Sequence, residues 1–298
     1  MSAGARLPGT PDPMHVWPGC GGVAISGDVW GDPHGPLVML QHGGGQTRHA
    51  WKSLGETLGQ AGYRAVAFDA RGHGDSQWAP SGIYGANDMV DDLCCVAKAL
   101  GSDHPILVGA SMGGSTSLVA VGENRLAASA LVLVDTAPQI EPGGARHIQE
   151  FMTQKPDGFD SLEEVAEAIA NYQPHRKRPR NLDGLVKNVR LAENGKYRWH
   201  WDPAFLMGRG GSLEEHVKRL HDCGNNLKLP TLLVRGGLSD VLSEEGARRF
   251  LEQCPHAEYV SVADAAHMVA GDRNDIFADA VIEFLMRVVP ATGGKSSR

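Results

Sequence analysis

The sequence predicts an α/β protein whose mostly parallel sheet carries helices on both faces. Short apolar runs bounded by glycine, proline or aspartate alternate with longer segments of helical periodicity, a pattern typical of strands buried on both faces. The segment 23–30, which contains Gly27-Asp28, is expected to form an antiparallel edge hairpin ahead of the parallel strands. The expected parallel strands are residues 37–40, 65–68, 106–108, 131–134, 232–234 and 259–262.

Helical periodicity fills the intervals between these runs. Met89, Leu93 and Val96 share one face of a helix, and apolar residues repeat at the same spacing through 276–288. Ser243 is a suitable N-cap residue because two glutamates follow it in the first turn, where they favour the helix dipole. Strand–helix alternation of this kind implies a parallel sheet covered on both sides.

One long stretch, residues 137–228, interrupts the alternation. It contains helical pieces, among them a segment from Ser161 with a Ser-x-x-Glu capping-box pattern, and a turn at 193–196 that suggests a hairpin. We therefore predict a core formed by residues 1–136 and 229–298, with a mainly helical cap, or lid, at 137–228. Residues 1–13 and 293–298 are expected to be loose tails, and the basic run 175–180 to be a solvated loop.

Composition narrows the class of protein. The chain has 298 residues, of which 42% are hydrophobic, so it can bury a large core. A net charge of −7 argues against a nucleic-acid-binding protein. Five scattered cysteines form no disulfide framework or zinc motif, and no signal peptide or transmembrane run is evident. We expect a cytoplasmic protein without a membrane span.

The strongest local signal is Gly109-Ala110-Ser111-Met112-Gly113, which lies between a predicted strand and a predicted helix. This is the G-x-S-x-G pattern in the strand–turn–helix context that it requires. The sharp turn holds its central residue in a strained conformation, and small residues on either side relieve the crowding. Ser111 is therefore the predicted nucleophile, exposed at a helix N-terminus where developing negative charge is favoured.

A glycine loop, Gln41-His42-Gly43-Gly44-Gly45-Gln46, directly follows the strand at 37–40. Glycine lets a backbone approach a substrate closely, so we expect the N–H groups of Gly44 and Met112 to form an oxyanion hole. His42 is expected to brace the loop and to carry no proton during the reaction.

A serine nucleophile needs a base, and the base needs a carboxylate to orient it. His267 follows the strand at 259–262 and is assigned as the base. Asp240 follows the strand at 232–234 and is the preferred acid, which completes a Ser111–Asp240–His267 triad. Asp135, directly after the strand at 131–134, remains the alternative acid.

These residues resemble the α/β-hydrolase superfamily over about residues 35–288. Asp69-Ala70-Arg71-Gly72-His73-Gly74-Asp75-Ser76 is similar to a loop that follows the fourth strand in many of its members, and the segments 134–138 and 267–272 resemble a bacterial esterase and perhydrolase-like subgroup. The resemblance implies an eight-stranded sheet, acyl-enzyme chemistry, no cofactor and no metal. It also implies that Arg71 has a structural role.

The expected function is hydrolysis of carboxylic esters or related small acyl substrates. A serine at position 111 suits attack on a carbonyl carbon, whereas epoxide hydrolases and dehalogenases of this fold use a carboxylate there. A lactonase, a carbon–carbon bond hydrolase, a cofactor-free perhydrolase and a ligand receptor on the same fold remain open, as does a homodimer. Trp199 and Trp201 are candidates either to line the substrate pocket or to anchor the cap.

Overall fold

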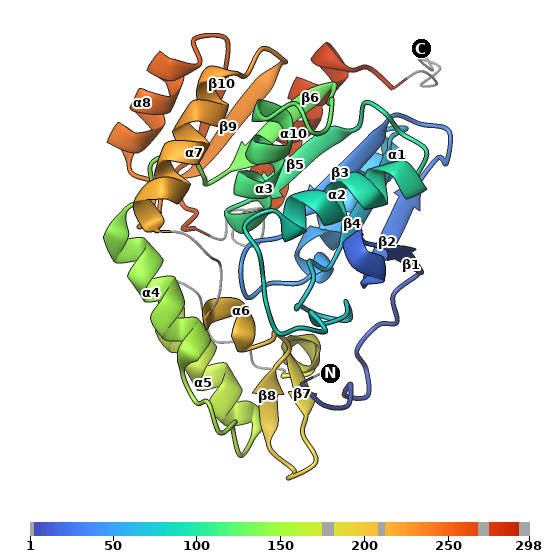
Figure 1. Ribbon diagram of the computed structural model, residues 1–298, viewed down its shortest axis with the longest axis vertical. Coiled ribbons are helices and arrows are strands. Elements are labelled where there is room, and N and C mark those ends of the chain that lie inside the picture. The colour runs from blue at the N-terminus through green and yellow to red at the C-terminus, as the bar shows by residue number, and fades with distance from the viewer. Residues whose placement is uncertain (1–2, 175–181, 208–211, 268–273, 292–298) are drawn as a thin grey trace.

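The computed structural model describes residues 3–174, 182–207, 212–267 and 274–291. Its centre is an eight-stranded sheet in the order β1-β2-β4-β3-β5-β6-β9-β10 (Figure 1). The pairs β1/β2 and β2/β4 are antiparallel and all other neighbours are parallel, which confirms the predicted mostly parallel sheet. The strands are β1 (His15–Pro18), β2 (Ala24–Gly31), β3 (Leu37–Gln41), β4 (Arg64–Phe68), β5 (Ile106–Ala110), β6 (Ala130–Val134), β9 (Thr231–Gly236) and β10 (Glu258–Val262).

Helices cover both faces of the sheet, because the central strands project apolar side chains from each face and these must be buried. One face packs on α1 (Lys52–Gln60) and α10 (Asn274–Val288). The other packs on α2 (Asp88–Ala99), α3 (Met112–Gly122), α7 (Leu213–Asn225) and α8 (Glu244–Gln253). Ser243 caps α8 as predicted, because its hydroxyl accepts the Gly246 N–H at 3.0 Å.

The edge hairpin differs from the prediction. Residues 24–31 form one continuous strand, and the hairpin partner is β1, which the short 3-10 turn Cys20–Gly22 connects to β2. Gly27 lies within the strand, where an added Cβ would sit 2.5 Å from the carbonyl oxygen of Ala67. This glycine therefore serves close strand packing and does not form a turn.

The cap lies at the lower end of the molecule in Figure 1, beyond the carboxyl ends of the parallel strands. Ser161 caps α5 by accepting the Glu164 N–H, and the turn predicted at 193–196 joins β7 to β8. Its elements are α4 (Pro142–Thr153), α5 (Leu162–Tyr172), a 3-10 helix (Asp183–Asn188), β7 (Val189–Leu191), β8 (Tyr197–Trp199) and α6 (Ala204–Met207).

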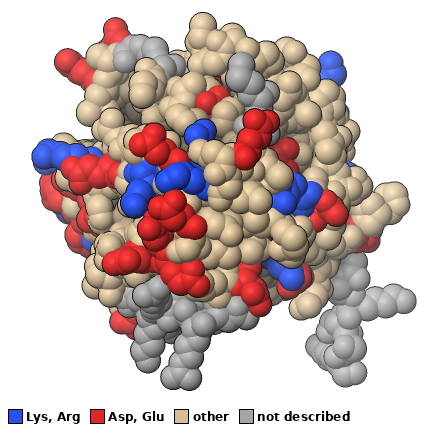
Figure 2. Space-filling model, turned by 90° about the horizontal axis from the view of Figure 1, so that it is seen from below, with Lys and Arg blue, Asp and Glu red and all other residues tan. Residues whose placement is uncertain are grey.

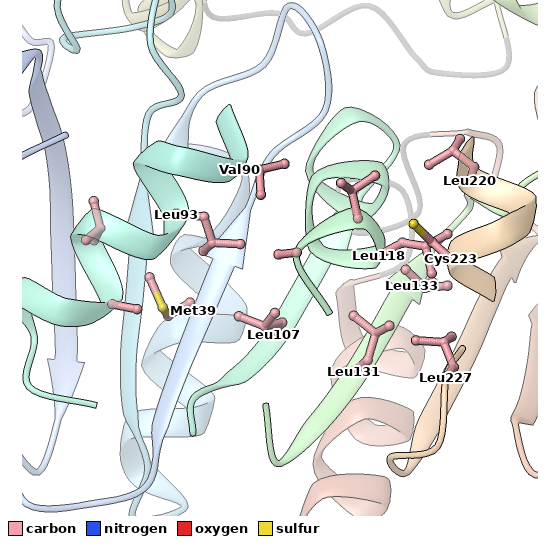
Figure 3. Close-up of a cluster of buried hydrophobic side chains, with 14 of the residues drawn as sticks. Met39, Val90, Leu93, Leu107, Leu118, Leu131, Leu133, Leu220, Cys223 and Leu227 are labelled. Carbon is pink, nitrogen blue, oxygen red and sulfur yellow. The ribbon is translucent and has the colours of Figure 1, made fainter. Parts of the chain in front are cut away.

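Helix α7 belongs to the core layer, although the predicted cap included it. Leu220 and Cys223 of this helix are buried in the same cluster as Leu118 of α3 and Leu131 of β6 (Figure 3). Gly122 of α3 admits the approach, since a Cβ there would lie 2.4 Å from that of Cys223. The packing thus ends the cap before α7 and not at residue 228.

The described part of the N-terminal segment, residues 3–13, is docked against the cap, contrary to the loose tail predicted for this segment. Ala5 exchanges two backbone hydrogen bonds of 2.8 Å with Leu191 of β7. Asp75 forms ion pairs with Arg6 of this segment, Arg48 of the core and Arg190 of β7. This buried carboxylate therefore joins the N-terminal segment, the core and the cap.

Charge is mixed on the face at the cap end of the molecule. Figure 2 shows basic side chains crossing the middle of that face, bordered by acidic ones. No helix within the described ranges is long and apolar enough to cross a bilayer. The expectations for the basic run 175–180, the tail 293–298 and the segment 268–272 fall outside the described residues.

Candidate active site

Ser111 occupies the sharp turn between β5 and α3. Its backbone angles, φ 47° and ψ −112°, fall outside the regions that non-glycine residues favour. A Cβ on Gly109 would lie 2.4 Å from the Gly113 backbone, so the turn requires a missing side chain at this position. The Ser111 N–H donates to Val134 O at 3.1 Å, which ties the turn to the end of β6.

His267 and Asp135 form a close pair at the same edge of the sheet. His267 Nδ1 lies 2.6 Å from Asp135 Oδ2, and the Asp135 side chain is fully buried. Asp135 also accepts the Gly236 N–H at 2.9 Å and the Ser239 hydroxyl. The His267 imidazole, the Gly236 N–H and the Ser239 hydroxyl together hold the carboxylate in one orientation. A neutral histidine that donates from Nδ1 has no proton on Nε2, so Nε2 can accept one.

Glycines at the end of β9 allow this pair to form. In the sheet, β9 separates β6, which precedes Asp135, from β10, which precedes His267. A Cβ on Gly236 would lie 2.3 Å from Ala266 O, and one on Gly237 would lie 2.5 Å from Ala263 O. Without these side chains, the loop that carries His267 packs directly over the end of β9, within reach of Asp135.

Asp240, the acid preferred from the sequence, does not approach His267. Its side chain is 53% exposed, and its Oδ2 lies 3.0 Å from Nδ1 of His147 on α4 of the cap. The preceding residue, Ser239, is the one that turns inward to Asp135. The structure therefore contradicts the predicted pairing of Asp240 with His267, because the loop after β9 turns this aspartate outward, and Asp135 occupies the place beside His267 instead.

Three hydrogen bonds hold the glycine loop in place. His42 Nδ1 pairs with Gly43 O at 2.8 Å, and His42 Nε2 accepts the Ala70 N–H at 2.9 Å, which is the bracing role expected for His42. The Gly43 N–H donates to Gln46 Oε1 at 3.0 Å. A Cβ on Gly43 would lie 3.3 Å from that of Ser111, so the loop stands beside the serine.

Cap side chains cover this loop. A Cβ on Gly45 would lie 3.4 Å from the Trp201 ring and 3.5 Å from Met152, and one on Gly44 would lie 3.6 Å from the sulfur of Met152. Trp199 stacks on Trp201 with ring centroids 4.9 Å apart, and both indoles are buried. Trp201 thus reaches the glycine loop. Trp199 lies on the other side of the Trp201 ring and packs against Phe159.

Sequence reasoning missed three contributors to this arrangement. The side chains of Gln46 and Ser239, which bind the Gly43 N–H and the Asp135 carboxylate, were not predicted as site residues. Met152 lies in α4, whose sequence carries no chemical motif. Arg71 has the structural role expected of it, because its guanidinium binds Asp92 with two contacts of 2.6 Å. Among the described residues, no group of three or more side chains has the arrangement of a metal site.

Two buried histidines beside the site are neutral at pH 7. Burial lowers the pKa of His42, and burial together with His73 and Arg190 lowers the pKa of His200 well below its usual value. His200 Nδ1 accepts the Gly74 N–H at 2.8 Å, and its Nε2 contacts Gly45 O at 3.3 Å. His200 therefore links the cap to the loops around the site in its uncharged form.

Acidification is expected to destabilise the fold through these histidines. Because their folded pKa values are depressed, the unfolded chain binds protons first as the pH falls below about 6.5. Each such histidine costs up to about 1.4 kcal/mol of unfolding free energy per pH unit until its folded pKa is reached. Urea unfolding between pH 7.5 and pH 5.5, in steps, measures this slope.

The replacement His200→Gln is expected to make that slope shallower, and His256→Gln, at an exposed position, is the matched control. A slope in His200→Gln equal to that of the parent protein would contradict the role given to His200.

The fold and the gathered side chains define the class: this protein is an α/β-hydrolase. The chain belongs to the family described as serine aminopeptidase, S33, whose model matches residues 32–274. It is 29% identical over 265 residues to esterase Rv0045c of Mycobacterium tuberculosis, covering 84% of this chain and 82% of that protein. It is 26% identical over 268 residues to the mouse sn-1-specific diacylglycerol lipase ABHD11, covering 86% and 82%.

Solved structures agree with this assignment. A crystal structure of the Mycobacterium tuberculosis esterase Rv0045c superposes with a TM-score of 0.69 at 27% identity and covers 92% of each chain. E-2-(acetamidomethylene)succinate hydrolase superposes with a TM-score of 0.77 at 22% identity, covering 91% of this chain and 98% of that one. The second likeness establishes the fold alone.

Proposed function

We propose that this enzyme is a serine hydrolase that cleaves carboxylic esters through an acyl-enzyme intermediate, with Ser111, His267 and Asp135 as its triad. The observation that carries the proposal is the 2.6 Å contact between His267 Nδ1 and the buried Asp135 carboxylate, at the edge where Ser111 occupies its strained turn. The esterase and lipase relatives support the same chemistry.

The reaction begins when His267 Nε2 takes the proton of Ser111 and the serine oxygen attacks the acyl carbon. Asp135 holds the imidazole in the required tautomer and stabilises its protonated form. His267 then gives the proton to the departing alcohol, which leaves an ester between the substrate's acyl group and Ser111. A water molecule activated by His267 hydrolyses that ester and restores the free serine.

The oxyanion hole consists of the N–H groups of Met112 and Gly44. Met112 begins α3, where the first backbone N–H groups have no partner within the helix. The Gly43 N–H is already engaged by Gln46, which favours Gly44 as the second donor. Such donors act on charge that appears only in the transition state, and each contributes on the order of 3–4 kcal/mol.

Trp201 and Met152 form an apolar wall above the oxyanion hole. Their contacts with the positions of Gly44 and Gly45 support a role in shaping the space for the acyl or alkoxy group. Trp199 supports Trp201 from behind, through the ring stacking described above. The substrate is accordingly a small acyl compound with an apolar part. We place the enzyme in the cytoplasm, an assignment supported by its five unpaired cysteines.

The proposal is tested with a fluorophosphonate probe, which labels only an activated serine. We expect stoichiometric labelling of the native protein, with the adduct on the peptide that contains Ser111 in mass spectrometry. A panel of p-nitrophenyl esters, lactones, β-diketones and acetate with peroxide then identifies the preferred reaction. Absence of labelling, or an adduct on another serine, would refute the proposal.

A further inference from the structure

A cavity lies at the amino ends of the parallel strands, at the opposite end of the sheet from Ser111. It has a volume of about 310 Å³, at the lower end of the range for small-molecule sites. Its walls include the first residues of β3, β4 and β5, whereas Ser111 follows the last residue of β5. A strand of this length spans roughly 15 Å, so the cavity is separate from the candidate active site.

The walls of this cavity are basic or neutral. Arg64, His34 and His104 line it, together with Ser102 and Ser129, and no carboxylate is among its lining residues. The nearest acidic residues by sequence, at positions 32 and 103, do not line it. A polar hollow that contains a guanidinium and two imidazoles provides several donors and attracts an anion.

The guanidinium of Arg64 has hydrogen-bond donors that no acceptor within the described residues occupies. Its Nη1 donates to Leu100 O at 3.2 Å, but its buried Nε has no acceptor. Within the described part of the chain, Arg64 also forms no ion pair, unlike the buried Arg48 and Arg71. An anion beside the guanidinium would neutralise this charge.

The cavity offers several hydrogen-bond donors, which suit a phosphate group because it presents several oxygen acceptors. The Ser129 hydroxyl is occupied, since it donates to His104 O at 2.8 Å. The guanidinium, the two imidazoles and the Ser102 hydroxyl remain as donors around the hollow. A phosphate offers several oxygens to such a set, and arginine suits it because its donors form a planar fork.

We propose that this cavity binds a small phosphate-bearing anion, such as inorganic phosphate or a compact phosphomonoester, with Arg64 as the principal contact. This binding does not depend on Ser111, because the two sites lie at opposite edges of the sheet.

Isothermal titration calorimetry at constant ionic strength tests the proposal with inorganic phosphate and glycerol 3-phosphate, and with acetate and chloride as comparison anions. We expect saturable binding of at least one phosphate compound and weaker binding of acetate and chloride. Loss of a charge-assisted contact in Arg64→Gln is expected to reduce the affinity about tenfold or more. Arg64→Lys should retain part of the affinity.

Arg198→Gln is the matched control, because this exposed arginine lies on β8 of the cap. It should leave phosphate affinity unchanged, as should Ser111→Ala, so this result is independent of the proposed hydrolase activity. His104→Gln, expected to weaken binding several-fold, serves as a second variant if Arg64→Gln does not fold. No saturable phosphate binding, or equal losses in Arg64→Gln and Arg198→Gln, would overturn the proposal.

Discussion

Replacing Ser111 with alanine is expected to lower kcat for p-nitrophenyl acetate and butyrate by about 10⁵- to 10⁶-fold, the scale of loss when a serine nucleophile is removed. The variant lacks the oxygen that forms the acyl-enzyme, while the oxyanion hole and the apolar wall of Trp201 and Met152 remain. The substitution removes only the hydroxyl of a residue outside the hydrophobic core, so the unfolding midpoint should change little. Initial rates and urea unfolding measure the two effects.

Ser115→Ala is the matched control, since Ser115 lies one turn further along α3 and has no part in the proposed mechanism. It should keep the activity of the parent protein within about twofold. Substantial turnover by Ser111→Ala, after exclusion of contaminating esterase, would show that another residue is the nucleophile.

The second large effect is expected from Asp135→Asn, which should lower kcat by about 10⁴-fold. Asparagine fits the same volume but presents an amide to His267 Nδ1, which favours the tautomer whose Nε2 carries the proton. That tautomer cannot accept the proton of Ser111. The comparison is made with the same ester substrates, and circular dichroism establishes that the variant is folded.

Asp240→Asn provides the decisive comparison. Asp240 is more than half exposed and pairs with His147 across the boundary between core and cap, and exposed pairs contribute about 0–1 kcal/mol to stability. We expect its kcat to stay within about twofold of the parent value. If Asp240→Asn loses as much activity as Asp135→Asn, the geometric assignment of the acid is wrong.

The fold was predictable from local sequence to a large extent. The six parallel strands were each predicted within one or two residues, because strands buried on both faces are continuous apolar runs between turn residues. The edge hairpin was less predictable, since β1 and β2 pair through a short turn rich in glycine and the Gly27-Asp28 step resembles a turn. The extent of the cap was also misjudged, because α7 has the amphipathic pattern of any surface helix.

The candidate site also contains residues that local sequence predicts and residues that it does not. Ser111 is determined by its neighbours in sequence, since the sharp turn needs Gly109 and Gly113 close on either side. His267 could be assigned because it is the only histidine after the last strand. The choice between Asp135 and Asp240 had no local signal, because both aspartates follow strands that end at the same edge of the sheet.

The sequence by itself predicted the strands of the sheet and the turn that holds Ser111, since both depend on patterns among residues close in the chain, and the position of His267 after the last strand indicated the proposed base. Only the tertiary structure decided the acid, the cover of the oxyanion loop and the end of the cap. Those features depend on how the ends of β6, β9 and β10 approach one another and on which face of a helix meets the core. Such contacts join residues more than a hundred positions apart, as His267 and Asp135 illustrate.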